Sequence, residues 1–156
     1  MQLPSHSTFR PMRPLLIWDG QCGFCKYWVI RWRHLTGHSI RYAPYQRMHQ
    51  RIDEIPENEF RKAVRLIETD GKIYSGAHAA YRVLHYTHRW SFLLVWYKKY
   101  AWFRKASDMG YRFISNNRPV LYRLTVLFFG EDPHNPSPYW IFYLAALLFI
   151  VAWVLS

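Results

Sequence analysis

Cysteine is nearly absent from this sequence, which has two cysteines in 156 residues. A disulfide-stabilised scaffold needs more cysteines at scattered positions, so that class of protein is excluded. Both cysteines lie in one CxxC motif, Asp19-Gly-Gln-Cys22-Gly-Phe-Cys25, which favours thiol chemistry or metal binding over core packing. The next residue is Lys26 and not histidine, which excludes the CxxCH motif of covalent c-type haem attachment.

Acidic residues are also scarce, with 10 Asp and Glu against 21 Lys and Arg, for a formal net charge of +11. Between Arg82 and Arg123 the basic residues are interleaved with aromatic ones, and Asp108 is the single acid. This pattern suits either a single-stranded nucleic acid or an anionic lipid surface, with a plain solvated helix face as the simplest alternative. The apolar tail that follows favours lipid, so no nucleic-acid partner is predicted.

Charge is absent from the last 18 residues, 139–156. As a helix this segment would be about 27 Å long, just enough to cross a bilayer, with Tyr139, Trp140 and Trp153 as interface anchors. We therefore predict a transmembrane anchor over 139–156, a lipid bilayer as partner, and a Pro-rich linker over 131–138. A buried C-terminal helix of a soluble fold is the alternative.

An apolar signal-peptide core is absent from residues 1–14, which we predict to be a flexible N-terminal arm. Every Lys and Arg precedes the apolar tail, and this bias predicts a membrane-bound protein, anchored at its C-terminus, whose folded part faces the cytoplasm. That compartment keeps thiols reduced, which disfavours a permanent structural disulfide between Cys22 and Cys25.

The order of apolar runs and turn signals predicts an α/β domain over residues 15–130. Its CxxC motif falls at the first strand-to-helix junction, the layout of a thioredoxin-like domain with extra C-terminal helices. The expected elements are a strand at 15–19, a helix at 25–35, a strand at 40–45, a hairpin at 63–74, a helix at 76–85 that Ser75 caps, and two or three helices within 90–129.

The position of Cys22 at the start of a helix predicts a reactive thiol. Unpaired backbone N–H groups and the positive end of the helix dipole favour the thiolate, which is the attacking form. We predict Cys22 as the catalytic nucleophile and Cys25, one turn further along, as the resolving thiol. The carboxylate of Asp19 has two candidate roles, a proton shuttle for Cys25 or a helix cap.

Zinc binding and a structural role are the two alternative uses of the cysteines. His34 and His38 follow at a histidine spacing typical of zinc fingers, but the gap from Cys25 is shorter than in a finger. On one continuous helix, Cys25 and His34 would lie about 13 Å apart, too far to share an ion. A CxxC pair that is idle in a structural protein is the other alternative. We predict no metal and no cofactor.

The chain resembles the DCC family of thiol-disulfide oxidoreductases, named for the pattern DxxCxxC that Asp19, Cys22 and Cys25 match. Residues 64–80 are similar to the family's hairpin and following helix, and residues 111–118 to its late Asn-Arg segment. The resemblance implies a thioredoxin-like fold and disulfide chemistry through the two cysteines. No proline stands near Ala63, where thioredoxins keep one that shapes their substrate groove, so that groove cannot be transferred to this chain.

The sequence therefore predicts a thiol-disulfide oxidoreductase of the protein disulfide reductase type, acting at a membrane surface on a protein or small-molecule disulfide. An accessory or structural subunit of a larger membrane protein complex, with an idle or regulatory CxxC, is the alternative.

Overall fold

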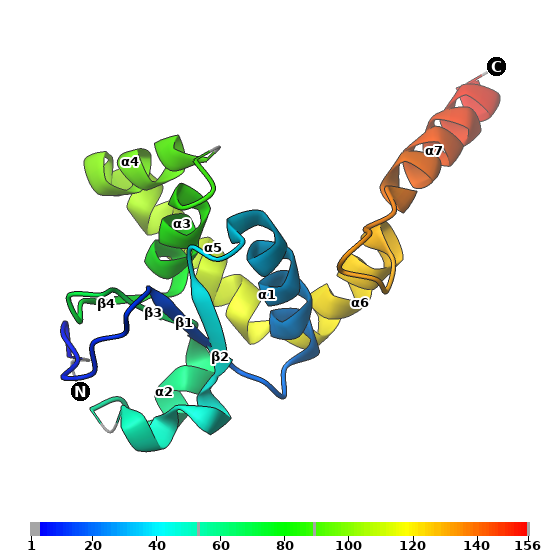
Figure 1. Cartoon of the computed structure of the whole chain (residues 1–156). Helices are drawn as coiled ribbons and strands as arrows, with labels where there is room; N and C mark the ends of the chain where they lie inside the picture. The colour runs from blue at the N-terminus through cyan, green and yellow to red at the C-terminus, as the bar shows by residue number, and fades with distance from the viewer. Residues whose placement is uncertain (1–3, 53, 89, 156) are drawn as a thin grey trace.

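The computed structural model describes residues 4–52, 54–88 and 90–155. Over these residues the chain forms one four-stranded mixed sheet and seven α-helices (Figure 1). The sheet has the strand order β2-β1-β3-β4, and its strands are β1 (Leu15–Trp18), β2 (Arg41–Pro44), β3 (Arg65–Ile67) and β4 (Ile73–Ser75). The predicted α/β class is confirmed.

Strand directions follow from the connections. β1 and β2 pair in parallel, with Leu15 opposite Arg41, and α1 (Gly23–Thr36) provides the crossover that a parallel pair requires. β3 runs antiparallel to β1, with Leu16 opposite Leu66, and β4 is antiparallel to β3. The hairpin predicted from the Asp-Gly turn is therefore present.

Alternating side chains of β1 supply two separate cores, one on each face of the sheet. Leu15 and Ile17 pack with Phe60 of α2 (Glu57–Lys62) and with Tyr45 of the 3-10 turn Tyr45–Arg47. Met48 and Ile52, which flank a second 3-10 turn (His49–Arg51), belong to the same core. Leu16 packs on the other face with Val29 of α1 and Val83 of α3 (Gly76–His85). Each fully buried aliphatic side chain contributes roughly 1.5–3 kcal/mol to stability. The two cores therefore hold β1 from both faces, next to the turn that leads into α1.

Three helices follow, as predicted for residues 90–129: α4 (Ser91–Lys99), α5 (Ala101–Asn116) and α6 (Arg118–Phe129). α4 and α5 pack against α3, whereas α6 packs against α1. Pro119 lies in the first turn of α6, where its missing N–H costs no helical hydrogen bond. The packing of α6 on α1 brings residues about one hundred positions apart in sequence beside the CxxC motif.

The apolar tail forms α7 (Tyr139–Leu155), which projects away from the α/β part (Figure 1). It contacts α6 through the rings of Phe128 and Tyr143, whose centroids are 6.0 Å apart. Of the helices in the described part of the chain, none is both long enough and apolar enough to cross a membrane, so the predicted transmembrane span is not supported. Ser156 and the side chain of Trp153 lie outside what is described.

The N-terminal arm predicted to be flexible packs along the hairpin over its described part, residues 4–14. Ser7 is buried and its N–H donates to the carbonyl of Gly71 (2.8 Å), while the Ser5 carbonyl accepts from the N–H of Ile73 (2.9 Å). Gly71 has φ +87°, and a Cβ there would lie 2.7 Å from the Ser7 carbonyl oxygen, so this close approach requires glycine. Residues 1–3 lie outside the described part.

Candidate redox-active site

Cys22 occupies the N-cap position of α1. Its backbone is extended (φ −87°, ψ 112°), and its Sγ accepts a hydrogen bond from the backbone N–H of Cys25 at 3.2 Å. The Cys22 carbonyl accepts the bond from Lys26 N–H at 2.9 Å. The helix therefore begins at Gly23, two residues before the predicted start, because the sulfur itself satisfies one of the unpaired N–H groups of the first turn.

The surroundings of Cys22 favour its thiolate. Hydrogen bonding by the Cys25 side chain is the main cause that lowers the pKa of Cys22, which falls to about 6. The Cys25 backbone N–H and the positive charge of Arg118 lower the pKa further, whereas partial burial and the negative charge of Asp19 oppose them. At neutral pH Cys22 is therefore mainly the nucleophilic thiolate.

The surroundings of Cys25 have the opposite effect. Cys25 is buried, and the pKa of its thiol is raised by the hydrogen bond to Cys22, by burial and by the negative charge of Cys22. Neither cysteine is in a disulfide. Cys25 is thus a protonated thiol that donates to Cys22 and lies one helical turn deeper than the half-buried sulfur of Cys22.

Asp19 holds the turn between β1 and α1. Its Oδ1 accepts hydrogen bonds from Gln21 N–H (3.1 Å) and from Nε2 of Gln46 (3.0 Å), and Oε1 of the same Gln46 accepts from Gly20 N–H (3.1 Å). The Asp19 carbonyl accepts from Cys22 N–H at 3.1 Å. Asp19 therefore positions the turn that presents Cys22, and the N-cap position belongs to the cysteine. The proton-shuttle role stays a prediction.

Cys22 faces an open groove of about 510 Å³ between the start of α1 and the start of α6. A Cβ on Gly23 would lie 3.3 Å from the Tyr122 ring, so this glycine permits the close approach of α6. The residues lining the groove are Asp19, Gln21, Cys22, Gly23, Phe24, Ser115, Arg118, Pro119, Tyr122 and Arg123. Sequence reasoning assigned no site role to α6; the only signal was the Asn-Arg segment that ends at Arg118.

Arg118 is held beside the groove by backbone oxygens. Its Nη1 donates to the carbonyl of Arg61 and its Nη2 to that of Lys62, both at 2.6 Å, and Nη2 also donates to Ser115 Oγ at 2.5 Å. All of these partners are neutral, and among the residues described no carboxylate forms an ion pair with Arg118. Its positive charge is therefore fixed in position and not neutralised by a neighbour.

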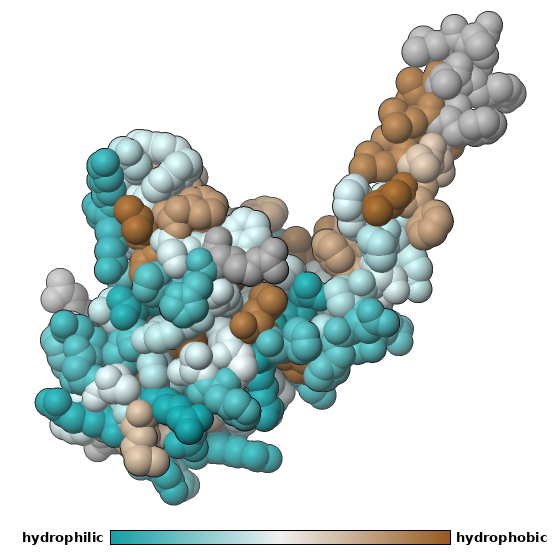
Figure 2. All heavy atoms as spheres, turned by 45° about the horizontal axis from the view of Figure 1, so that its top comes forward, coloured by the Kyte–Doolittle hydropathy of each residue, from teal (hydrophilic) through white to brown (hydrophobic). Residues whose placement is uncertain are grey.

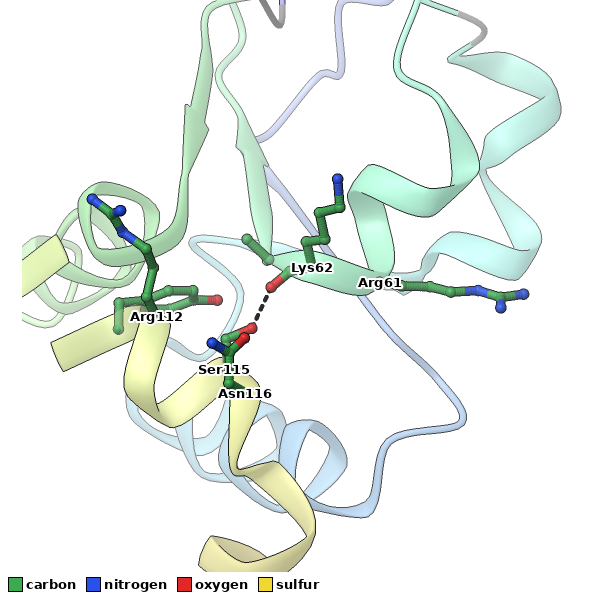
Figure 3. A pocket seen from close by; sticks show the side chains of 7 residues that line it. Arg61, Lys62, Arg112, Ser115 and Asn116 are labelled. Carbon is green, nitrogen blue, oxygen red and sulfur yellow. Dashed lines mark hydrogen bonds between the residues drawn. The ribbon is translucent and has the colours of Figure 1, made fainter. Parts of the chain in front are cut away.

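A second hollow, of about 490 Å³, lies between the end of α2 and α5, next to the Cys22 groove (Figure 3). Ser115 lines both spaces, and its Oγ donates to the Lys62 carbonyl at 2.5 Å. The side chains of Arg61 and Arg112 point outward in opposite directions, and Arg61 pairs with Glu57 at 3.0 Å. The cations of this second hollow thus face solvent, unlike Arg118.

No histidine is among the described residues that line the groove. His78 lies between the rings of Tyr74 and Tyr97, with centroid distances of 4.6 and 4.9 Å, and burial lowers its pKa to about 4. Across the described ranges there is no group of three or more His, Cys, Asp or Glu side chains arranged to hold a metal ion. The ionisable residues that line the groove are therefore Cys22, Asp19, Arg118, Tyr122 and Arg123.

A half-buried thiol of lowered pKa at the edge of an open groove, with a buried thiol one turn away, defines a candidate thiol-disulfide redox protein. Comparison with known families agrees: the chain belongs to the DCC1-like thiol-disulfide oxidoreductase family, whose profile matches residues 16–124. No curated protein and no solved structure shows a significant match. The family assignment places the chain in a general class of redox enzymes and covers α1 and the start of α6 but not α7.

Proposed function

We propose that the protein is a disulfide reductase in which Cys22 attacks the substrate and Cys25 resolves the mixed disulfide. The observation that carries the proposal is the pairing of an N-cap sulfur that faces the groove with a buried thiol one turn behind it. The strand order β2-β1-β3-β4, with β1 and β2 parallel, supports the predicted thioredoxin-like arrangement around this pair.

The reaction proceeds in two exchanges. The Cys22 thiolate attacks one sulfur of the substrate disulfide, a bond forms between Cys22 and that sulfur, and the other substrate sulfur leaves as a thiolate that water protonates. Cys25 then loses its proton and attacks Cys22 Sγ, which closes the Cys22–Cys25 disulfide and releases the second substrate thiolate. The substrate gains two electrons from the cysteine pair, and a thiol or dithiol reductant returns the pair to its reduced form.

Reduction of insulin by the full chain, with dithiothreitol as the reductant, tests this proposal. Replacement of Cys22 by serine should lower the rate by at least about 10³-fold, because a serine hydroxyl remains protonated at neutral pH. The matched control is Arg51→Gln, a change at an exposed side chain outside the groove, which should keep wild-type activity. Equal rates for wild type and Cys22→Ser would refute the proposal.

We further propose that α7 binds the surface of a lipid bilayer and holds the redox site there, on the cytoplasmic side. The described side chains of α7 are exposed and apolar, with Phe142 at 69% and Leu148 at 66% exposure, and Figure 2 shows hydrophobic atoms along the projecting helix. Trp96 and Trp102 are exposed on α4 and α5 near Lys98 and Lys99, which suits anionic lipid.

Flotation of the full chain with vesicles that contain anionic lipid tests the membrane contact. The double variant Phe142→Lys, Leu148→Lys should remain in the protein fraction, while wild type floats with the vesicles. Labelling of Cys22 in intact cells by a membrane-impermeant thiol reagent tests the side. Rapid labelling from outside would contradict a cytoplasmic site.

A second candidate function is that of an accessory subunit of a membrane protein complex. It is favoured by α5, which buries none of its residues and exposes Trp102, Met109 and Phe113 at 63–67%. Mass measurement after purification in mild detergent distinguishes the two candidates. A single species of 19.0 kDa argues against the subunit, whereas a defined larger assembly without insulin reduction supports it.

A further inference from the structure

The groove beside Cys22 is lined by an excess of positive charge. Its lining contains two cations, Arg118 and Arg123, and one acidic residue, Asp19. The Oδ1 of Asp19 already accepts hydrogen bonds from Gln21 N–H and from Gln46. Because Cys22 is itself negative as a thiolate, the groove without its two arginines would repel any anionic substrate. The arginines therefore decide which charge a substrate can carry.

The two arginines differ in how they are held. Arg118 is held by three neutral oxygens, those of Arg61, Lys62 and Ser115, so its charge stays at the edge of the groove. Arg123 lies further along α6 with an exposed side chain, and it has no hydrogen bond or ion pair to other described residues. It remains available to an incoming ligand.

The rest of the lining is uncharged and largely apolar. Phe24 on α1 and Pro119 and Tyr122 on α6 border the same groove, and Tyr122 closes on Gly23. Such walls accept the carbon chain of a small disulfide, while guanidinium groups at the rim bind a carboxylate by charge-assisted hydrogen bonds. The groove thus combines a nucleophilic sulfur, an apolar wall and two cations.

We propose that the Cys22 groove selects disulfides that carry a carboxylate near the reactive sulfur, with Arg118 and Arg123 as the specificity-determining residues. The inference rests on the proposed function, because it names the substrate class of the same site. In the first exchange Cys22 forms a bond to the substrate sulfur nearer the arginines and the distal sulfur departs as a thiolate. Cationic disulfides are disfavoured, since both arginines repel them.

The test uses the full chain carrying Cys25→Ser, so that the mixed disulfide at Cys22 accumulates and can be counted by intact mass. Three small disulfides differ mainly in charge: dithiodipropionate is anionic, bis(hydroxyethyl) disulfide is neutral and cystamine is cationic. Each rate is divided by the rate at which the same disulfide reacts with free mercaptoethanol, which corrects for the different intrinsic reactivities of the three disulfides. The normalised rates should fall from anionic to neutral to cationic, with about tenfold between the extremes at low salt.

Arg123→Gln in the same background should reduce the anionic-to-cationic ratio about threefold, the size expected for one rim charge. The matched control Arg51→Gln removes the same charge outside the groove and should keep the full ratio. Equal normalised rates for the three disulfides, or an equal fall for both variants, would overturn the inference. Insulin reduction by the chain with both cysteines separates this inference from the proposed function. Insulin reduction without a charge preference would overturn only the inference. A charge preference without insulin reduction would overturn only the proposed reductase function.

Discussion

Cys22 and Cys25 begin the same helix three residues apart, yet the fold gives the two thiols opposite properties. Cys22 caps α1 at the rim of an open groove, and the pKa of its thiol falls to about 6. Cys25 is buried in the first turn, and the pKa of its thiol rises. The difference shows that the two ends of one CxxC motif lie in unequal surroundings, as the proposed nucleophile and resolving thiol require.

The contrast between the two pKa values depends on one shared hydrogen bond and on the greater burial of Cys25. The Cys25 side chain donates to Cys22, so the same contact lowers one pKa and raises the other. Arg118 of α6 favours the thiolate of both cysteines, and Asp19 disfavours it for both. Removal of the Cys25 donor, of Arg118 or of Asp19 should therefore change the reactivity of Cys22 by a different and measurable amount.

Cys25 is expected to give the largest effect. Cys25→Ser should lower the catalytic turnover at least about 10²-fold, because no thiol remains to release the mixed disulfide. Intact mass should then show substrate trapped on Cys22. The paired variant Cys25→Ala also removes the side-chain donor, so its Cys22 should be alkylated more slowly at pH 6 than in Cys25→Ser. Equal alkylation rates in the two variants would show that the shared hydrogen bond does not stabilise the thiolate.

Arg118 is expected to give an intermediate effect. Arg118→Gln should slow alkylation of Cys22 at pH 6 about threefold, because loss of the positive charge raises the pKa of the thiol. Arg118→Lys keeps the charge but loses the bonds of the planar guanidinium to α2, and it should retain most of the wild-type rate. If both variants were equally slow, Arg118 would act through the packing of α6 and not through its charge.

Asp19 is expected to give the smallest effect. Asp19→Asn keeps an oxygen that can accept from Gln21 N–H and Gln46, but it removes the negative charge that raises the pKa of Cys22. Alkylation of Cys22 at pH 6 should become faster by about twofold or less, with little change in turnover. A tenfold loss of turnover with normal alkylation would instead assign Asp19 the predicted proton-shuttle role.

The sheet and the position of the CxxC motif could be predicted because their signals are local. The apolar run Leu15–Trp18, the Asp-Gly turn before β4 and the glycine that ends α1 each specify structure within a few residues. Gly37 shows this directly: it has φ +53° and its N–H donates to the Arg33 carbonyl at 3.0 Å.

The rest of the site depends on tertiary packing that no local pattern contains. Arg118 reaches the Cys22 groove only because α6 packs on α1 and its guanidinium binds α2 carbonyls. Ser75 occupies the predicted N-cap of α3, but its hydroxyl makes no capping bond and instead accepts from the buried Arg65, which needs a partner. The N-terminal arm likewise packs along the hairpin because Gly71 and Glu54, both distant in sequence, accept hydrogen bonds from its backbone.

The proposed chemistry requires that Cys22 is a thiolate at neutral pH while Cys25 is not. The rate of iodoacetamide alkylation of each cysteine, measured in the full chain by peptide mass from pH 4 to pH 9, tests it most directly. We expect a half-maximal rate for Cys22 near pH 6 and almost no alkylation of Cys25 across the range. If the alkylation rates of both cysteines instead rose together, with a midpoint near the ordinary thiol pKa of about 8.5, Cys22 would not be a thiolate at neutral pH.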